Sequence, residues 1–315
     1  MSTSAALRTT AVLAAGAAAG FAYALLEAHA FTVRHAVVPV LDPDAEPVRI
    51  LHVSDLHLVP SQTDKIAFVR DLATLEPDVV VDTGDNLAHR EALPPLLHAL
   101  EPLLALPGAF VLGSNDYYAP VAKSWSRYLR KDPRDADTPR ALRRRDTESR
   151  VLPAGELAAE LRRAGWKDLT NRRDAVITRH THLDLVGVDD PHLDRDEFPA
   201  RAPLPRGALR VGVAHAPYRR VLEAMRHDGA ELVLAGHTHG GQLAVPGYGA
   251  LVTNCDLDRG RAKGLHGWPG PRPDARGGQG SYWLHVSAGL GTSPFAPVRF
   301  ACRPEATLLE LVPAD

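Results

Sequence analysis

The chain has little cysteine. Cys255 and Cys302 are the only two among its 315 residues, which is too few for the disulfide framework of a small secreted scaffold. Neither stands in a C-x-x-C pattern, so the sequence offers no redox motif and no cysteine-based zinc site. One structural disulfide and two free thiols both remain open, and the disulfide would need an oxidising compartment.

The chain also lacks a large net charge of either sign and any internal repeat. Its formal net charge is -2 and its pI is near 6.7, so there is no overall basic field to attract nucleic acid. We therefore expect no nucleic-acid partner, and no sequence feature predicts a protein partner. With 45% hydrophobic residues, the chain can form one large α/β domain with a full core.

One uncharged run, residues 11–26, follows Arg8 near the N-terminus. Its length lies between a signal-peptide core and a full membrane span, and its alanines and glycines make it only weakly hydrophobic. We interpret residues 1–30 as a membrane anchor or signal segment. An uncleaved anchor is favoured because no clear A-x-A site follows; a removed signal ranks second and a buried helix third. With Arg8 inside, the rest of the chain would be extracytoplasmic, or secreted if the segment is cleaved.

A proline-punctuated stretch, residues 31–47, is predicted to be a linker, and residues 48–315 the catalytic domain. Three successive β-α units at the start of this domain indicate a sheet with parallel strands. The predicted strands are Val48–Val53, Val79–Asp82, 109–112, 175–178, 183–188, 209–214, 231–234, Tyr282–Val286 and 307–311. The predicted helices are 65–75, 91–106, 156–163 and 220–227.

Residues 120–153 interrupt this alternation. They are too rich in charge to form a core and too many for an ordinary connection between elements. We predict a surface lid or flexible insertion, with a solvated surface as the commonest role of such a charge run.

Five of the predicted strands end in loops that contain Asp, His or Asn, and ligands bind at the carboxyl ends of strands in α/β sheets. Asp55 and His57 are two residues apart, and in extended backbone such residues project to the same side. His237 and His239 repeat the spacing. Asp85 follows a glycine at a strand exit and can lend one carboxylate oxygen to each of two cations. Imidazole with carboxylate favours zinc, manganese or iron over calcium.

Each of these motifs is weak by itself. With 15 histidines a D-x-H is expected by chance, and a lone Gly-Asp-Asn is more often a turn than a site. Residues 180–182 copy the H-T-H of residues 237–239 without flanking glycines, so we interpret them as a polar hairpin tip. We expect His52, His98 and His285 in the core or on the surface. The order of five motifs, each at a strand end, is what chance does not explain.

Together the motifs resemble the signature of the calcineurin-like metallophosphoesterase superfamily, from about residue 48 to the C-terminus. They are D-x-H at 55–57, G-D-N at 84–86, a G-N-H-D-like element at 113–116, a histidine at 215 and G-H-x-H at 236–239. The G-H-T-H-G-G-Q sequence and the N-terminal segment look like the membrane-associated bacterial branch, which includes phosphodiesterases and a lipid-linked nucleotide pyrophosphatase. The resemblance implies an α/β fold, a four-layer αββα sandwich of two mixed sheets flanked by helices.

The resemblance also implies two divalent metal ions (Mn, Fe or Zn) at the strand C-terminal ends. It assigns one ion to Asp55, His57, Asp85 and His239. It assigns the other to Asp85, an amide, His215 and His237.

One position departs from the family pattern. Gly113-Ser114-Asn115-Asp116 stands where the family has Gly-Asn-His-Asp. Because serine is a poor ligand for such ions, we expect the loop to shift and Asn115 to supply its amide oxygen. The imidazole that helps the leaving group depart is then missing. His89 is a candidate substitute in the catalytic set with Asp85 and Asn115, although a surface position at a helix entry is the commoner role of such a residue.

These residues predict a metal-dependent phosphoesterase that hydrolyses a phosphodiester, pyrophosphate or phosphomonoester by attack of hydroxide held between two cations. Without a general acid, we expect a preference for diesters or pyrophosphates with good leaving groups. The alternative is a catalytically weak, metal-stabilised binding module at the membrane; a third hypothesis is a metal hydrolase of amides or other esters. Buried Asp and His clusters are costly without metal, which argues against the binding module. The membrane segment and the charged insertion are compatible with an anionic, lipid-linked substrate.

Overall fold

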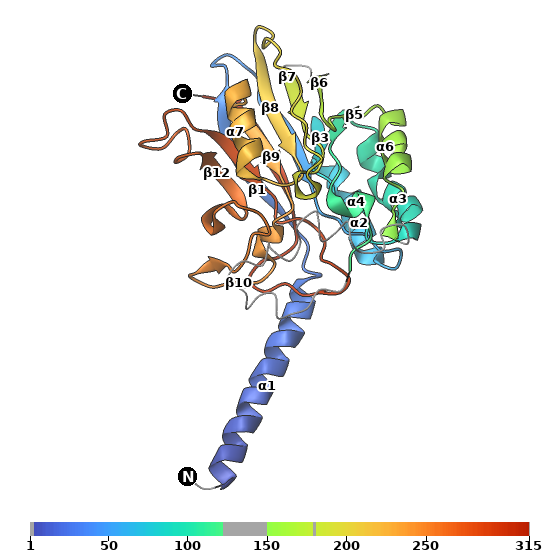
Figure 1. Ribbon diagram of the computed structural model, residues 1–315, viewed down its shortest axis with the longest axis vertical. Coiled ribbons are helices and arrows are strands. Elements are labelled where there is room, and N and C mark those ends of the chain that lie inside the picture. Colours follow the sequence, from blue (N-terminus) through green and yellow to red (C-terminus); the bar gives the residue numbers. More distant parts are fainter. Residues whose placement is uncertain (1–2, 122–149, 179–180, 315) are drawn as a thin grey trace.

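Two six-stranded mixed sheets lie face to face in the computed structural model, which describes residues 3–121, 150–178 and 181–314 (Figure 1). The first sheet, in spatial order, contains β1 (Thr32–Leu41), β14 (Glu305–Pro313), β2 (Val48–Val53), β3 (Val79–Asp82), β4 (Gly108–Phe110) and β5 (Lys167–Asp168). The second contains β12 (Gly264–Trp268), β13 (Tyr282–Val286), β9 (Leu232–Ala235), β8 (Ala208–Ala214), β7 (His182–Gly187) and β6 (Arg172–Ile177). A separate hairpin pairs β10 (Ala244–Val245) with β11 (Gly249–Ala250).

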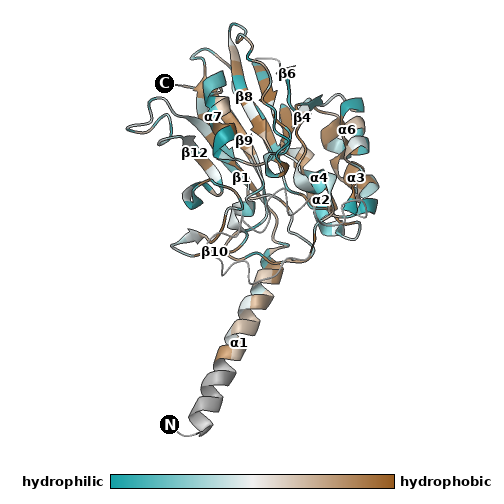
Figure 2. Cartoon of the chain, viewed as in Figure 1, coloured by the Kyte–Doolittle hydropathy of each residue, from teal (hydrophilic) through white to brown (hydrophobic). Residues whose placement is uncertain are grey.

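Helices cover the outer face of each sheet. They are α2 (Thr63–Asp71), α3 (Leu93–Leu104) and α6 (Ala154–Arg163) on the first sheet and α7 (Arg219–Asp228) on the second. Apolar residues of the two sheets fill the space between them, and two further cores lie beneath the helices. Figure 2 shows this concentration of apolar residues on the strands. The αββα sandwich is therefore confirmed.

Parallel pairing places the functional ends of the strands on one edge. β2, β3 and β4 are parallel neighbours in the first sheet, as are β7, β8 and β9 in the second. Parallel strands share the direction in which they end, so the loops after these six strands meet on one side.

The prediction of a linker at residues 31–47 is wrong for most of that stretch. Residues Thr32–Leu41 form strand β1, which pairs in parallel with β14 and buries Val38 and Leu41 between the sheets. Pro39 suggested a linker because proline cannot donate to a strand ladder. It is tolerated here because β1 is an edge strand.

The predicted charged insertion lies mostly outside the described residues, which resume at Arg150. Its two ends are close together, since Tyr118 bridges Val151 and the Leu152 N–H donates to the Tyr117 carbonyl at 2.9 Å. The predicted hairpin tip at residues 180–182 lies partly outside the described residues; the strands on either side of it, β6 and β7, pair antiparallel with Ile177 opposite His182. Both cysteines are buried, and among the described residues neither forms a disulfide.

Helix α1 (Thr3–Glu27) projects away from the sandwich (Figure 1). Its last turn is bound to the loop that precedes β14. The Arg299 N–H donates to the Ala24 carbonyl at 2.9 Å, and the Glu27 carboxylate accepts from the N–H groups of Ala301 and Cys302 at 2.9 and 2.8 Å. Over the described part of the chain, we find no helix with both the length and the apolar character to cross a bilayer.

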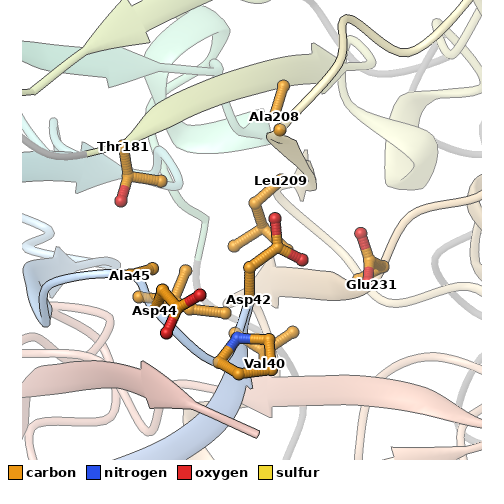
Figure 3. Close-up of a pocket in the computed structure, with 11 residues that line it drawn as sticks. Val40, Asp42, Asp44, Ala45, Thr181, Ala208, Leu209 and Glu231 are labelled. Atoms are coloured by element: carbon orange, nitrogen blue, oxygen red, sulfur yellow. The ribbon is translucent and has the colours of Figure 1, made fainter.

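A cavity of about 520 Å³ lies at the edge opposite the functional strand ends (Figure 3). It is lined by Asp42 and Asp44 after β1, by Thr181 before β7 and by Glu231 before β9. Burial and the neighbouring Asp42 carboxylate raise the pKa of Glu231. None of the predicted metal ligands lines this cavity.

Candidate metal centre

Six of the seven predicted metal ligands gather where four strands end. Asp55 and His57 follow β2 and Asp85 follows β3, while three histidines follow strands of the second sheet. Two groups of side chains could each hold an ion, because their candidate ligand atoms lie within 4.8 Å of one another. The first group is Asp55, His57 and His239, and the second is Asp55, Asp85 and His215. Residues from both sheets therefore converge on one small volume.

The first group has the geometry of ligands around an ion. The Nε2 atoms of His57 and His239 lie 3.1 Å apart, and the Asp55 Oδ1 atom lies 3.5 Å from the His239 nitrogen. Two nitrogen ligands about 2.1 Å from one tetrahedral ion would be about 3.4 Å apart. The donor set thus fits a borderline divalent cation.

Asp85 faces both groups. Its Oδ2 atom lies 3.4 Å from His57 Nε2, and its Oδ1 atom lies 3.5 Å from His215 Nε2. His237 completes the second group, with its Nδ1 atom 3.3 Å from the same His215 nitrogen. One carboxylate can therefore contact two ions, as the sequence predicted.

Backbone carbonyls orient three of the imidazoles. The pairs are His239 Nδ1 with the Gly291 oxygen at 3.1 Å, His215 Nδ1 with the Thr83 oxygen at 2.8 Å, and His237 Nε2 with the Asn254 oxygen at 3.2 Å. A carbonyl accepts a proton from the nitrogen it faces, which leaves the other ring nitrogen with a lone pair. In each case that second nitrogen points into the cluster.

The backbone at the cluster is left-handed, not extended as the i, i+2 argument assumed. Asp55, His57, Asp85, His237 and His239 have φ values of 50°, 43°, 58°, 68° and 51°, and they are five of the eleven such non-glycine residues in the described chain. These conformations cost energy and persist only when the surrounding structure enforces them. Tight turns, rather than alternation along a strand, bring the side chains together.

The Gly113 loop fits closely against the cluster. A Cβ at Gly113 would collide with the Asp85 carboxylate and the His215 ring, so the backbone itself approaches these groups. Asp116 holds the loops in place, since its carboxylate accepts from the N–H groups of Gly113, Asp85 and Asn86 at 2.8, 2.9 and 2.8 Å. The G-S-N-D element thus shapes the Asp85 turn.

Charges in the cluster perturb one another. Burial, reinforced by the Asp55 carboxylate, raises the pKa of Asp85 to about 7. Although burial opposes the charged imidazolium, the carboxylates of Asp85, Asp190 and Asp55 raise the pKa of His215 to about 9. Without cations the negative charges attract protons, and a bound cation would replace those protons.

His57 and His239 have the opposite tendency. Burial lowers the pKa of both well below the usual value. Buried Arg299 adds to the effect at both rings, and buried Lys65 adds to it at His57. Arg299 is fully buried and donates to the carbonyls of Ala288 and Gly291, both at 2.7 Å. These imidazoles are therefore neutral, which is the form that binds metal.

Asn115 lies beside the cluster, but its observed contacts differ from the predicted one. Its backbone N–H donates to the Asp85 Oδ1 atom at 2.6 Å, and its side-chain NH2 donates to the Tyr118 carbonyl at 3.0 Å. Within the described residues its side-chain oxygen forms no hydrogen bond with the cluster. Asn115 therefore orients Asp85 through the backbone.

The structure does not bring His89 into the cluster. His89 is exposed, and its Nδ1 atom accepts from the Glu91 N–H at 3.1 Å at the start of the 3-10 turn Arg90–Ala92. This is the helix-entry role that is commoner for such a residue.

The sequence analysis missed several residues at this edge. Asp190 follows β7 and is fully buried. His192 is half-buried, and its ring centroid lies 4.7 Å from that of His237. The rule that found the other ligands, polar residues just after a predicted strand, also applies to Asp189 and Asp190. No motif marked them.

Comparison with known proteins agrees with this geometry. The family described as calcineurin-like phosphoesterase matches residues 48–241. Phosphodiesterase YaeI of Escherichia coli is 28% identical over 289 residues, covering 89% of this chain and 87% of the relative. UDP-2,3-diacylglucosamine pyrophosphatase LpxG of Chlamydia trachomatis is 26% identical over 291 residues, covering 83% of each. A Bos taurus transmembrane protein with metallophosphoesterase domain is 29% identical over 235 residues, covering 69% of this chain and 46% of the relative.

The family match spans more than half of the chain and includes all six clustered residues. With the αββα sandwich and two Asp/His groups that share a carboxylate, it shows that the chain belongs to the calcineurin-like phosphoesterase family.

Proposed function

We propose that this protein is a dinuclear metal-dependent hydrolase of phosphoric esters that prefers phosphodiesters or pyrophosphates. The observation that carries the proposal is Asp85, whose two oxygens face separate histidine groups 3.4 and 3.5 Å away. Two divalent cations held there would activate a water molecule and neutralise charge on the phosphoryl oxygens.

The chain's own residues supply position and charge. The carbonyls of Gly291 and Thr83 fix the rings of His239 and His215, so their lone pairs are aimed before any ion arrives. The Asn115 N–H holds the bridging carboxylate at 2.6 Å. Such fixed groups need no reorganisation during the reaction, and this is the main contribution of a protein to phosphoryl transfer.

The preference for diesters and pyrophosphates rests on the residue at position 115. Asn115 replaces the imidazole of the family pattern, and an amide cannot donate a proton to a departing alkoxide. Leaving groups that depart without a proton are then favoured. The names of the phosphodiesterase and pyrophosphatase relatives are consistent with this preference.

We also propose that the active site works against a membrane, on a lipid-linked phosphate ester. Support comes from large apolar side chains exposed on α1 and on neighbouring loops. They are Phe21 at 61%, Leu26 at 73%, Tyr248 at 65%, Phe295 at 58% and Phe300 at 36%. The Tyr23 and Phe300 rings pack 5.4 Å apart, so α1 and the loop share one surface. An extracytoplasmic location is the corresponding proposal for the domain.

The test is turnover of bis-p-nitrophenyl phosphate by the full chain in detergent, with and without Mn2+. We expect activity that requires the ion and falls more than about 100-fold in Asp85→Asn, which keeps shape and removes the shared charge. Asp174→Asn is the matched control, because Asp174 is exposed on β6, where its carboxylate lies 3.3 Å from the Lys167 ammonium and accepts from the Ala175 N–H at 2.7 Å.

The outcomes separate the hypotheses. Metal binding without hydrolysis of any phosphate ester would favour the metal-stabilised binding module. Turnover confined to amides or carboxylic esters would favour the third hypothesis. Equal activity of Asp85→Asn and the wild type would contradict the proposed site.

A further inference from the structure

Asp190 is a buried carboxylate with one uncommitted oxygen. Its side chain is fully buried. Its Oδ1 atom accepts from the His192 N–H at 2.9 Å, at the start of the 3-10 turn Pro191–Leu193. Its Oδ2 atom has no hydrogen-bond partner among the described residues. Such an oxygen is expensive to bury unless another group, such as a cation, binds it.

The fold places Asp190 beside the second histidine group. β7 and β8 are parallel and paired up to Gly187 and Val213, so Asp190 and His215 follow neighbouring strand ends. Two residues after Asp190, the ring of His192 packs against the ring of His237, with 4.7 Å between the ring centroids.

The adjacent acid has a different role. Asp189 accepts from the Tyr117 hydroxyl and from the Arg195 Nε atom, both at 2.8 Å. It also accepts from the Asp190 N–H at 2.7 Å. Asp189 is thus committed to holding the loop, whereas Asp190 presents its free oxygen at the same strand edge.

The family pattern provides an amide oxygen as a ligand for the second ion, and within the described residues this chain does not present one to the cluster. The side-chain NH2 of Asn115 donates to Tyr118, and Ser114 offers only a hydroxyl. We propose that Asp190, through Oδ2, supplies the oxygen ligand of the second ion in place of this amide. The inference rests on the two-metal site of the proposed function. A carboxylate adds one negative charge, which strengthens the attraction for a divalent cation relative to a neutral amide.

The test is the number of ions bound by the full chain in detergent, measured by equilibrium dialysis against Mn2+ and elemental analysis. The wild type is expected to bind two ions. At the same free Mn2+, Asp190→Asn is expected to bind one, with the second affinity at least 10-fold weaker, in line with the roughly 10–100-fold effects of losing groups around a metal. Asp194→Asn, on the same loop and half-exposed beside Arg220, should keep two.

A reciprocal variant keeps the test decisive. Asn115→Ala retains the backbone N–H that orients Asp85 and should still bind two ions. Loss of the second ion in Asn115→Ala would return the ligand role to the amide and overturn the proposal, even if Asp190→Asn proved unstable.

Thermal unfolding gives a readout independent of activity. Metal-free Asp190→Asn should unfold at the wild-type temperature or above it, since the change removes a buried unpaired carboxylate, but it should gain less from Mn2+. Two ions bound with unchanged affinity in Asp190→Asn would overturn the Asp190 assignment alone. A wild type that binds fewer than two ions would overturn the proposed function with it.

Discussion

The Nδ1 atoms of His52 on β2 and His285 on β13 lie 2.8 Å apart in the buried space between the two sheets. Burial lowers the pKa of both, so both rings are neutral. From His52 the contacts continue through Thr83 at 3.0 Å and Ser54 at 2.7 Å to the Asp55 carboxylate at 2.5 Å. The Thr83 hydroxyl donates to the Ser54 oxygen, and the Ser54 hydroxyl donates to the Asp55 carboxylate. The Thr83 oxygen therefore accepts from His52 Nε2. His52 Nδ1 then carries no proton and accepts from His285 Nδ1. Every proton in this chain therefore points toward Asp55, and such chains strengthen one another.

Removing the last donor of this chain should weaken metal binding. Ser54→Ala leaves the Asp55 oxygen without its short hydrogen bond, and we expect a 10–100-fold weaker affinity for the first ion. Mn2+ dialysis with elemental analysis measures it. Ser281→Ala is the control, since the Ser281 hydroxyl accepts from the Gly270 N–H at 3.1 Å, away from the cluster. Unchanged affinity in Ser54→Ala would show that the chain does not orient Asp55.

The metal-free protein should lose the stability that His215 contributes as the pH rises from about 6.5 to 9. The folded pKa of His215, about 9, exceeds its unfolded value near 6.5. His215 therefore contributes up to about 3 kcal/mol to the free energy of unfolding below pH 6.5, and this contribution is lost as the pH rises past 9. The Asp85 pKa of about 7 is also raised above its unfolded value, so Asp85 likewise contributes less to stability as the pH rises from about 4 to 7. Buried Lys65 acts in the opposite direction above pH 7, because burial lowers its pKa to about 7, and the buried neutral histidines oppose the slope near pH 6.5.

Urea unfolding of EDTA-treated protein at several pH values measures this slope. Saturating Mn2+ should reverse the slope. The ions bind Asp85 and His215 only in their deprotonated forms, so they stabilise the folded protein more as the pH rises. His215→Gln removes this contribution, and an unchanged slope between pH 6.5 and 9 in that variant would contradict the arrangement of charges described above.

Leaving-group dependence should reveal the absence of a family-type general acid. We expect aryl phosphodiesters to react at least about 100-fold faster than alkyl phosphodiesters, the lower bound of a typical general-acid contribution. Rates with p-nitrophenyl and methyl leaving groups measure the ratio. Near-equal rates would indicate that another proton donor is present, and the half-buried His192 beside His237 would be the first residue to replace.

The exposed apolar side chains near α1 should bind lipid. We expect the full chain to sediment with anionic phospholipid vesicles and the double variant Phe21→Glu, Leu26→Glu to remain in the supernatant, because each change places a charge where an apolar group would contact lipid. Val37→Glu is the control, since Val37 is 54% exposed on the edge strand β1. Equal sedimentation of the double variant would contradict the membrane contact.

Strong local patterns made much of the fold and the site predictable. β2 and β3 coincide with their predicted bounds because short runs of Val, Ile and Leu end in polar loops. The cluster of Asp55, Asp85 and His215 followed from parallel strands ending on one edge. Strand β1 was missed because Pro39 is compatible with a strand only at an edge, which depends on a neighbour more than 250 residues away.

The unpredicted part of the site depends on tertiary contacts. The sequence predicted that the Asn115 side-chain oxygen would bind an ion. In the structure Asn115 lies in the four-residue helix α4 (Ser114–Tyr117), and its orientation is set by hydrogen bonds to the Tyr118 carbonyl and to Asp85. Asp190 belongs to no motif, and only the register of β7 against β8 places it near His215.

The binding of Glu27 to the loop before β14 has a mechanical consequence. Its carboxylate accepts from the Cys302 N–H, and the Cys302 thiol donates to the His239 carbonyl at 3.3 Å. Two side chains thus connect the end of α1 to a metal-binding turn. Because the last turn of the N-terminal helix is hydrogen-bonded to the domain, a surface that bound this helix would also set the direction in which the metal-binding edge faces.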